Sequence, residues 1–289
     1  MYTLPNAKIN IGLRVVGRRP DGYHDLQTVF YPISLADSLE IKPAPHLRQP
    51  YEFILSGLPV PADGKPNLVE RVFISMQEEF RLPSTSIFLC KHIPVGAGLG
   101  GGSSDAAHMM RLLNECYRLD ISDAEMEQRL AAFGADCPFF VRNKPVYAEG
   151  TGNRFTPIKL SLKGTYIVLV KPPIHVSTSE AYAEIDRKLL NSQSSIPKLD
   201  LDIDSGIMPV NSQFSILKAW RTSVTNDFEP VVFARYPRVA AIKQTLYDMG
   251  ALYASMSGSG SAVYGLFSRP IDNAAAVFPD CFTFSGTMM

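Results

Sequence analysis

Apolar and polar residues alternate along the chain from position 7 to position 15. The apolar positions are Ile9, Ile11, Leu13 and Val15, and the polar positions are Lys8, Asn10 and Arg14. A period of two predicts a half-buried β-strand. The segment GRRPDGYHD at 17–25 then supplies Pro, Asp and Gly in the order of a turn, and the apolar run at 26–33 predicts a second strand.

Helical spacing begins after Asn67, which is placed to form a capping box with Glu70 and predicts a helix over 68–80. A second helix is predicted at 103–117, and a third from Ser122 to Gly134. The residues of the second helix that are predicted to turn inward are Ala106, Met109, Met110 and Leu113. Further strands are predicted at 38–42, 51–55, 86–92, 145–152 and 165–173.

The last fifty or so residues alternate between the two patterns. Helices are predicted at 238–249 and 272–278, and strands at 252–256, 262–267 and 281–284. Such alternation indicates a compact α+β unit with its own sheet. The polar tract at 191–209 is interpreted as a loop inside the second half of the chain.

Composition narrows the class of protein. The 289 residues suggest two domains, and 46% hydrophobic with 19% charged residues is typical of a globular chain. The 28 basic residues balance 28 acidic ones, so no net charge attracts nucleic acid or an anionic membrane. The start MYTLPNAKIN is unlike a signal peptide, and no apolar run approaches the roughly 18 residues of a membrane span, so we expect a cytoplasmic protein. The four scattered cysteines indicate free thiols.

The segment VGAGLGGGSSDAA at 95–107 places five glycines and two serines in front of a predicted helix. A purely structural turn is one interpretation. A dinucleotide site is another interpretation, because Gly96, Gly98 and Gly101 satisfy G-x-G-x-x-G. Such a site should be followed, about 20 residues later, by an acidic residue at the end of the next strand, and here that part of the sequence is the start of a predicted helix. A third is a phosphate cradle of backbone N–H groups at a helix N-terminus, with Ser103 and Ser104 in the first turn. No Walker motif occurs.

Three motifs resemble those of the GHMP kinases, named for galactokinase, homoserine kinase, mevalonate kinase and phosphomevalonate kinase. PVGAGLGGGSS at 94–104 is similar to their phosphate-binding motif, and SMSGSGSAVYGLF at 255–267 to their C-terminal glycine motif. PNAKINIGLRV at 5–15, followed by RRPDGYHDLQTVF at 18–30, resembles one branch, which phosphorylates 4-diphosphocytidyl-2-C-methyl-D-erythritol in the non-mevalonate isoprenoid pathway. The DGYH segment selects that branch.

The resemblance implies an α+β protein with the GHMP kinase two-domain fold. An N-terminal α/β domain like the second domain of ribosomal protein S5 is expected at 1–160, and a C-terminal ferredoxin-like domain at 161–289. ATP is the implied co-substrate, and Mg²⁺ is expected with it, although the sequence identifies no dedicated metal ligand. The implied ATP-binding residues are Pro94, Val95, Gly96, Ala97, Gly98, Leu99, Gly100, Gly101, Gly102, Ser103 and Ser104.

Phosphoryl transfer requires mainly the positioning of groups and the neutralisation of charge. Asp136, in GADCPFF, would by itself be interpreted as a turn or helix-cap residue, but it matches the catalytic base of the family. Lys8 would ordinarily be solvated on the polar face of its strand. It matches the family lysine that pairs with that base and supports charge on the developing alkoxide.

The resemblance also implies a site for the cytidyl substrate. Tyr23 and His24 lie in the predicted turn, where such residues are usually exposed, and their positions in the branch hold the cytidine. Asn10 would reach the erythritol end. Thr178 and Tyr182, in HVSTSEAY, would close over the cytosine.

The predicted function is therefore direct, ATP-dependent phosphorylation of the 2-hydroxyl of this cytidine diphosphate-linked alcohol, with no phosphoenzyme and with neither nucleic acid nor membrane as partner. A GHMP-type kinase of another small alcohol, such as homoserine or mevalonate, is the alternative within the superfamily. A nicotinamide-dependent oxidoreductase that uses the three spaced glycines is a second alternative. A non-enzymatic protein with an S5-like fold is a third, against which the neutral charge and Asp136 argue.

Overall fold

The computed structural model describes residues 1–61, 64–190 and 210–289. These residues gather into two compact units, neither of which is continuous in sequence. Unit 1 consists of Met1–Ala7, Leu35–Val95 and Gly100–Lys144, and unit 2 of Lys8–Ser34, Gly96–Leu99 and Pro145–Met289. The domain ranges 1–160 and 161–289 stay a prediction, and the loop interpreted at 191–209 lies outside the described residues.

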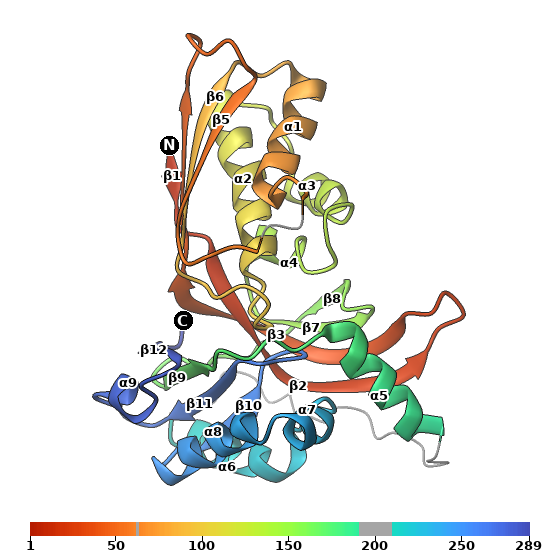
Figure 1. The fold of residues 1–289 in the computed structure, drawn as a ribbon, viewed down its shortest axis with the longest axis vertical. Coiled ribbons are helices and arrows are strands. Elements are labelled where there is room, and N and C mark those ends of the chain that lie inside the picture. The colour runs from red at the N-terminus through yellow and green to blue at the C-terminus, as the bar shows by residue number, and fades with distance from the viewer. Residues whose placement is uncertain (62–63, 191–209) are drawn as a thin grey trace. The chain divides into compact units, whose positions relative to one another are not determined.

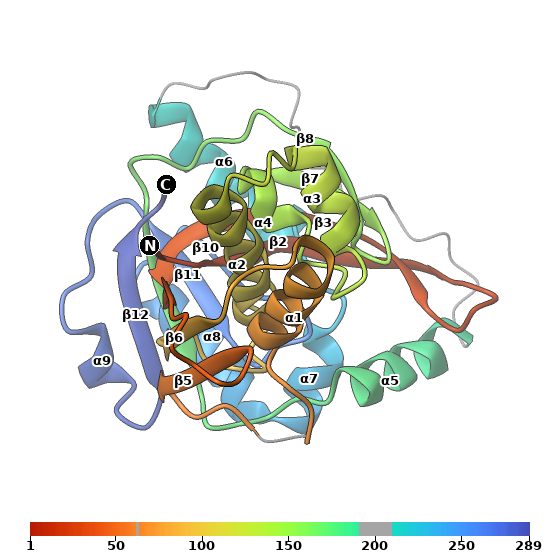
Figure 2. The same ribbon diagram turned by 90° about the horizontal axis from the view of Figure 1, so that it is seen from above.

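Unit 1 is built on a four-stranded sheet in the order β1–β4–β6–β5. Its strands are β1 (Tyr2–Thr3), β4 (Ser38–Pro43), β5 (Tyr51–Gly57) and β6 (Thr85–Lys91). Leu39 lies opposite Leu89 and Ile41 opposite Ile87, so the register gives the sheet one apolar, buried face. The helices are α1 (Leu68–Phe80), α2 (Gly101–Tyr117), α3 (Asp123–Leu130) and α4 (Phe139–Arg142), with α1 and α2 side by side along the sheet (Figures 1 and 2).

Unit 2 contains two further four-stranded sheets, in the orders β2–β3–β7–β8 and β10–β11–β9–β12. Their strands are β2 (Asn6–Arg18), β3 (His24–Ala36), β7 (Val146–Gly150), β8 (Arg154–Pro157), β9 (Tyr166–Lys171), β10 (Tyr253–Met256), β11 (Val263–Phe267) and β12 (Phe282–Thr287). The first two residues of β2 and the last two of β3 belong to unit 1. The helices are α5 (Thr178–Leu190), α6 (Val210–Ser223), α7 (Glu229–Arg235), α8 (Pro237–Asp248) and α9 (Ala274–Val277). Val168 and Val263 of the second sheet share an apolar core with Leu246 of α8.

The sequence patterns located several of these elements correctly. The capping box of α1 is confirmed, because Asn67 Oδ1 accepts from the amide of Val69 at 3.0 Å and the Glu70 carboxylate accepts from the amide of Asn67 at 2.8 Å. The helix predicted at 103–117 is α2, and all four residues predicted to face inward are buried. The strand predicted at 7–15 lies inside β2.

Other predictions were wrong in their bounds or missed an element. The helix predicted from Ser122 to Gly134 ends at Leu130, because the amides of Ala132 and Phe133 bond three residues back and tighten the chain into turns. Helix α9 is shorter than predicted, and α4, α5, α6, α7, β1 and β8 were not predicted. Among the described helices, none has both the length and the apolar character that a membrane span requires.

Candidate active site

The glycine stretch at 94–104 begins three residues after β6 and runs into α2. Gly100 is the N-cap of α2, and its φ of +69° is a left-handed conformation that favours glycine. The first turn of α2 contains no acidic side chain, so the positive end of a 17-residue helix carries no opposing charge there. The unbonded N–H groups of such a turn bind anions.

The two serines of the stretch have different surroundings. Ser104 is fully buried, its amide donates to Gly100 O at 2.8 Å, and its hydroxyl lies 3.3 Å from Nδ1 of His108. Burial lowers the pKa of that imidazole to about 4. Ser103 is only half-buried, and its hydroxyl lies against the turn that contains Asp136, since a Cβ atom added to Gly134 would be 3.9 Å from Ser103 Oγ.

Asp136 follows α3 in this turn and is half-buried. The next residue, Cys137, is completely buried, and burial raises the pKa of its thiol to about 11 while a hydrogen bond from Ser103 lowers it. A thiol with that pKa stays protonated and inert at neutral pH. Asp136 and Ser103 are therefore two half-buried polar side chains of unit 1 that lie at and beside this turn.

The middle of the glycine stretch, Gly96–Leu99, belongs to unit 2, where it touches the C-terminal glycine motif. Gly98 O accepts from Ser257 Oγ at 2.8 Å and from Lys8 Nζ at 3.1 Å. A Cβ atom on Gly98 would stand 2.1 Å from Ser257 O, a distance that no side chain tolerates. The backbone contact therefore requires glycine at this position.

Lys8 is buried, with 3% of its surface exposed, and not solvated as its place on a polar strand face would suggest. Its ammonium donates to Asn10 Oδ1 at 2.6 Å as well as to Gly98 O, and it lies 4.6 Å from the ring centroid of Phe30. Asn10 is also buried, and its amide nitrogen donates to Thr28 Oγ1 at 3.0 Å. Unit 2 thus fixes the lysine against the glycine stretch.

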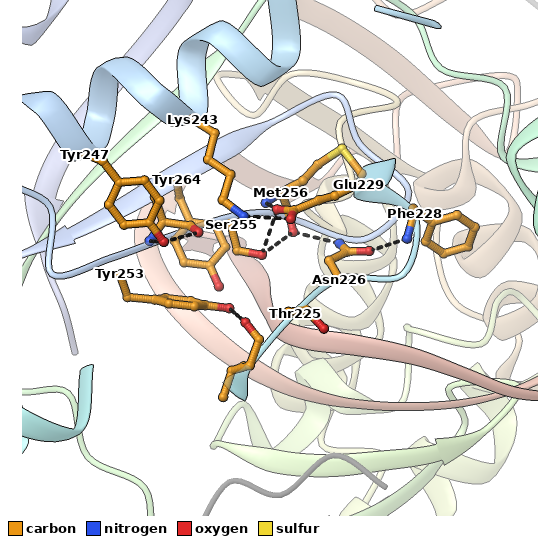
Figure 3. A network of polar contacts seen from close by, with 12 residues as sticks. Thr225, Asn226, Phe228, Glu229, Lys243, Tyr247, Tyr253, Ser255, Met256 and Tyr264 are labelled. Carbon is orange, nitrogen blue, oxygen red and sulfur yellow. Dashed lines mark hydrogen bonds and ion pairs between the residues drawn. The ribbon is translucent and has the colours of Figure 1, made fainter. Parts of the chain in front are cut away.

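Residues that the sequence did not single out hold the C-terminal glycine motif in place (Figure 3). Asn226 Nδ2 donates to Met256 O and Gly258 O, both at 2.8 Å, and Asn226 Oδ1 accepts from the amide of Phe228 at 2.9 Å. Glu229 accepts from the amide of Met256 at 2.9 Å and from Lys243 Nζ at 2.6 Å. The signal in the sequence was the segment TNDFEP at 225–230, in which three polar residues without periodicity lead into α7.

The predicted cytidine residues are partly assembled within unit 2. His24 and Tyr182 stack, with ring centroids 4.5 Å apart and planes 14° apart. His24 Nε2 lies 2.6 Å from Oδ1 of Asp186, one helical turn beyond Tyr182 on α5. The expectation of an exposed turn holds for Tyr23, which is 67% exposed, and is wrong for His24, which begins β3 and is buried by these contacts. Thr178 is exposed, and its hydroxyl bonds Ser259 Oγ at 2.9 Å.

Comparison with known proteins decides the family. Models of the GHMP kinase N-terminal and C-terminal domains match residues 67–144 and 215–282. A 4-diphosphocytidyl-2-C-methyl-D-erythritol kinase of Bacteroides fragilis is 48% identical over 268 residues, which cover 93% of this chain and 92% of that protein. The chain belongs to the GHMP kinases. A relative of the same name from Parabacteroides distasonis is 45% identical over 289 residues, the full length of both proteins.

Solved structures agree with this assignment. A crystal structure of 4-(cytidine 5'-diphospho)-2C-methyl-D-erythritol kinase matches with a TM-score of 0.80 and 30% identity, over 99% of this chain and 98% of that one. A mevalonate kinase of L. major matches with a TM-score of 0.65 and 16% identity, over 98% and 96% of the two chains, and so shares the fold alone. The predicted two-domain GHMP kinase fold and ATP-dependent kinase activity are confirmed, and the oxidoreductase and non-enzymatic alternatives are rejected.

Proposed function

We propose that this GHMP kinase transfers the γ-phosphoryl group of ATP to the 2-hydroxyl of 4-diphosphocytidyl-2-C-methyl-D-erythritol. The identity of 48% to a relative that carries this substrate in its name supports the proposal. The observation that carries it is the aromatic pair His24 and Tyr182, built from the DGYH segment and α5, because stacking on aromatic rings is how proteins hold single bases.

The phosphates of ATP lie, in this proposal, on the backbone N–H groups of residues 95–103, which follow Pro94. The free N–H groups and the dipole of α2 stabilise their charge without a cationic side chain. Ser103 supplies a hydroxyl, whereas Ser104, whose hydroxyl and amide both have partners inside the protein, supports the turn.

Mg²⁺ is expected with ATP and would neutralise phosphate charge if bound here. Within the described residues, no group of three or more His, Cys, Asp or Glu side chains is arranged to hold a metal ion. Hard oxygen donors suit Mg²⁺, and the Ser103 hydroxyl, half-buried at the start of α2, would be one such donor.

Asp136 is proposed as the general base that accepts the proton of the attacking hydroxyl, so the alkoxide forms only as the phosphoryl group transfers. Lys8 is proposed to stabilise the charge of that oxygen. The contacts of Lys8 with Asn10 and Gly98 hold its ammonium in one position, which reduces the reorganisation needed during the reaction.

The cytidine is proposed to bind at Tyr23, His24, Thr178 and Tyr182, with Asn10 near the erythritol end. Tyr23 presents an exposed ring in the turn before β3, and Tyr182 lies edge-on against the buried Phe228 at 4.9 Å, which fixes its orientation. The cytoplasm stays the expected compartment.

A coupled assay of ADP release tests the substrate. The cytidyl alcohol, homoserine and mevalonate are offered in parallel with MgATP, and we expect turnover with the cytidyl alcohol alone. Turnover with homoserine or mevalonate, and none with the cytidyl alcohol, would reject the proposed substrate and leave the family assignment intact.

A further inference from the structure

Asn10, which accepts a hydrogen bond from the ammonium of Lys8, is held within unit 2 at its backbone as well as at its side chain. Its amide N–H donates to Ser257 Oγ at 3.1 Å, and its carbonyl accepts from the Tyr264 hydroxyl at 2.8 Å. These partners are completely buried. With the backbone of β2 fixed here, the remaining freedom of Asn10 is a half-turn of its side-chain amide, which exchanges Oδ1 and Nδ2.

The orientation of this amide decides what the ammonium of Lys8 meets. In the structure Oδ1 faces the lysine and accepts from Nζ at 2.6 Å. After a half-turn Nδ2 would face the ammonium, and two groups that can only donate would oppose each other. Lys8 is 3% exposed, so bulk water would not replace the lost acceptor. The ammonium would then leave the position that this contact defines.

Thr28, on the neighbouring strand β3, selects the observed orientation. Its hydroxyl donates to Gly12 O at 2.5 Å, and this contact uses its one hydrogen. Toward Asn10 the hydroxyl oxygen can therefore only accept, and the atom that faces it is the donor Nδ2, at 3.0 Å. The donors thus run in one direction, from the ammonium through the amide and the hydroxyl to the carbonyl of Gly12.

We propose that Thr28 is a positioning residue for the phosphoryl transfer, because its hydroxyl fixes the amide of Asn10 and, through that amide, the ammonium of Lys8. The inference rests on the proposed role of Lys8 at the attacking oxygen. An ammonium that is already in place stabilises the developing charge without reorganisation during the reaction. Loss of the Thr28 hydroxyl should therefore slow the transfer and leave the binding of both substrates intact.

The test is steady-state kinetics of Thr28→Val, which removes the hydroxyl and keeps the volume and the branching of the side chain. We expect kcat with MgATP and the cytidyl alcohol to fall about 10- to 100-fold, the effect of a hydrogen bond to a charged group. Both KM values should change by less than about threefold. Thr28→Ser keeps the hydroxyl and should restore most of kcat. A raised KM with unchanged kcat would place Thr28 in substrate binding and overturn the proposal.

Thr165→Val is the matched control. Thr165 is another completely buried threonine of unit 2, and its hydroxyl also donates to a backbone carbonyl, that of Leu162 at 2.6 Å. Each valine variant leaves a buried carbonyl unpaired, so both should lose stability in urea, but Thr165→Val should keep wild-type kcat. An equal fall in kcat for the two variants would assign the effect to lost stability and overturn the proposal. If Thr28→Val does not fold, Thr28→Ala, which also lacks the hydroxyl, is measured in its place.

A double substitution tests whether Thr28 acts through Asn10. Asn10→Ala removes the acceptor of Lys8, and the Thr28 hydroxyl then has no amide to orient. We expect kcat of Asn10→Ala/Thr28→Val to equal that of Asn10→Ala within about twofold. Losses that multiply would show that the two residues act independently, which contradicts the proposal.

These results distinguish the role of Thr28 from the proposed function. Wild-type kcat in Thr28→Val, with the cytidyl alcohol turned over, would overturn the role of Thr28 and leave the proposed function standing. Turnover of homoserine or mevalonate in place of the cytidyl alcohol would reject the proposed substrate. The same ratios of kcat, measured on that alcohol, would then decide the role of Thr28.

Discussion

The two glycine-rich segments of this kinase are each held by a lysine and its carboxylate partners, buried at Lys91 and half-buried at Lys243. Beneath the first, Lys91 faces Asp37 and Asp105, and one oxygen of Asp105 has no partner in the described residues. Beside the second, Lys243 faces the single carboxylate of Glu229, whose other oxygen accepts from Ser255 and Met256.

The two lysine–carboxylate clusters differ in how their charges balance, and this difference decides whether each cluster depends on pH. In the second cluster one positive charge meets one negative charge and both carboxylate oxygens are bonded, so its geometry does not depend on a proton. In the first cluster an excess carboxyl group must hold a proton or carry an unpaired charge. The support of the C-terminal motif is therefore fixed, whereas the support of the phosphate-binding stretch responds to pH.

Replacing the glycine at which the two segments meet should have the largest effect. In Gly98→Ala, the new Cβ atom would overlap Ser257 O, and φ of +76° disfavours any side chain. We expect kcat/KM to fall by about 100-fold or more, since small misplacements of reacting groups cost that much. Gly17→Ala, where a Cβ atom meets nothing within 4 Å, is the control and should keep near wild-type kinetics.

The substitution Asn226→Ala should break the contacts that hold the C-terminal glycine motif in place. The change removes the donor to Met256 O and Gly258 O and the acceptor for Phe228 N, and leaves these buried groups unpaired. We expect the free energy of unfolding, measured by urea denaturation, to fall by about 2–4 kcal/mol. Because no group titrates, the loss should be equal at pH 6 and pH 9. A loss that varies with pH would contradict the comparison.

The cluster of Lys91, Asp37 and Asp105 should make the free energy of unfolding depend on pH. Asp105 has a pKa of about 8 in the folded protein, against an ordinary value of 3.8, so the folded state binds the extra proton. The stabilisation is complete below the lower value and is lost as pH rises through the higher one. Between pH 6 and 9 we expect wild-type stability to fall by about 3 kcal/mol, and that of Asp105→Asn to stay level over this window. Parallel curves would show that Asp105 is ionised throughout.

The smallest effect is expected at a surface cluster with the same ratio of charges. Arg129 contacts Glu79 and Glu125, but both carboxylates are exposed, and the hydrogen bonds of Arg129 lower the pKa of Glu79, whereas burial raises that of Asp105. Arg129→Met should lower Tm by only about 1–3 °C, independent of pH from 6 to 9. A large or pH-dependent shift would mean that burial is not what distinguishes Lys91.

The sequence patterns correctly predicted the features that depend on contacts between residues close together in the chain. The capping box of α1, the inward face of α2 and the glycine stretch depend on residues close together in sequence. The burial of Lys91 could not be predicted, because it ends a strand of ordinary pattern and its partner Asp37 is 54 residues away. His24 was expected in an exposed turn for the same reason, since Asp186, 162 residues further on, covers it.

The missed helices have a related cause. Helix α7 has seven residues and a proline in its first turn, too short for an apolar period to emerge. Its importance lies in Glu229, which is held by contacts with β10 and α8 that only the folded chain provides. The family resemblance supplied the site residues that no local pattern indicated, and their roles stay proposals.

The most direct test of the account is the Asp136→Asn variant, measured for turnover of the cytidyl alcohol and for MgATP binding on the same preparation. We predict a loss of turnover of at least about 100-fold, because the general base is gone, with MgATP affinity unchanged. Undiminished turnover in that variant would contradict the assignment of the base and, with it, the proposed mechanism.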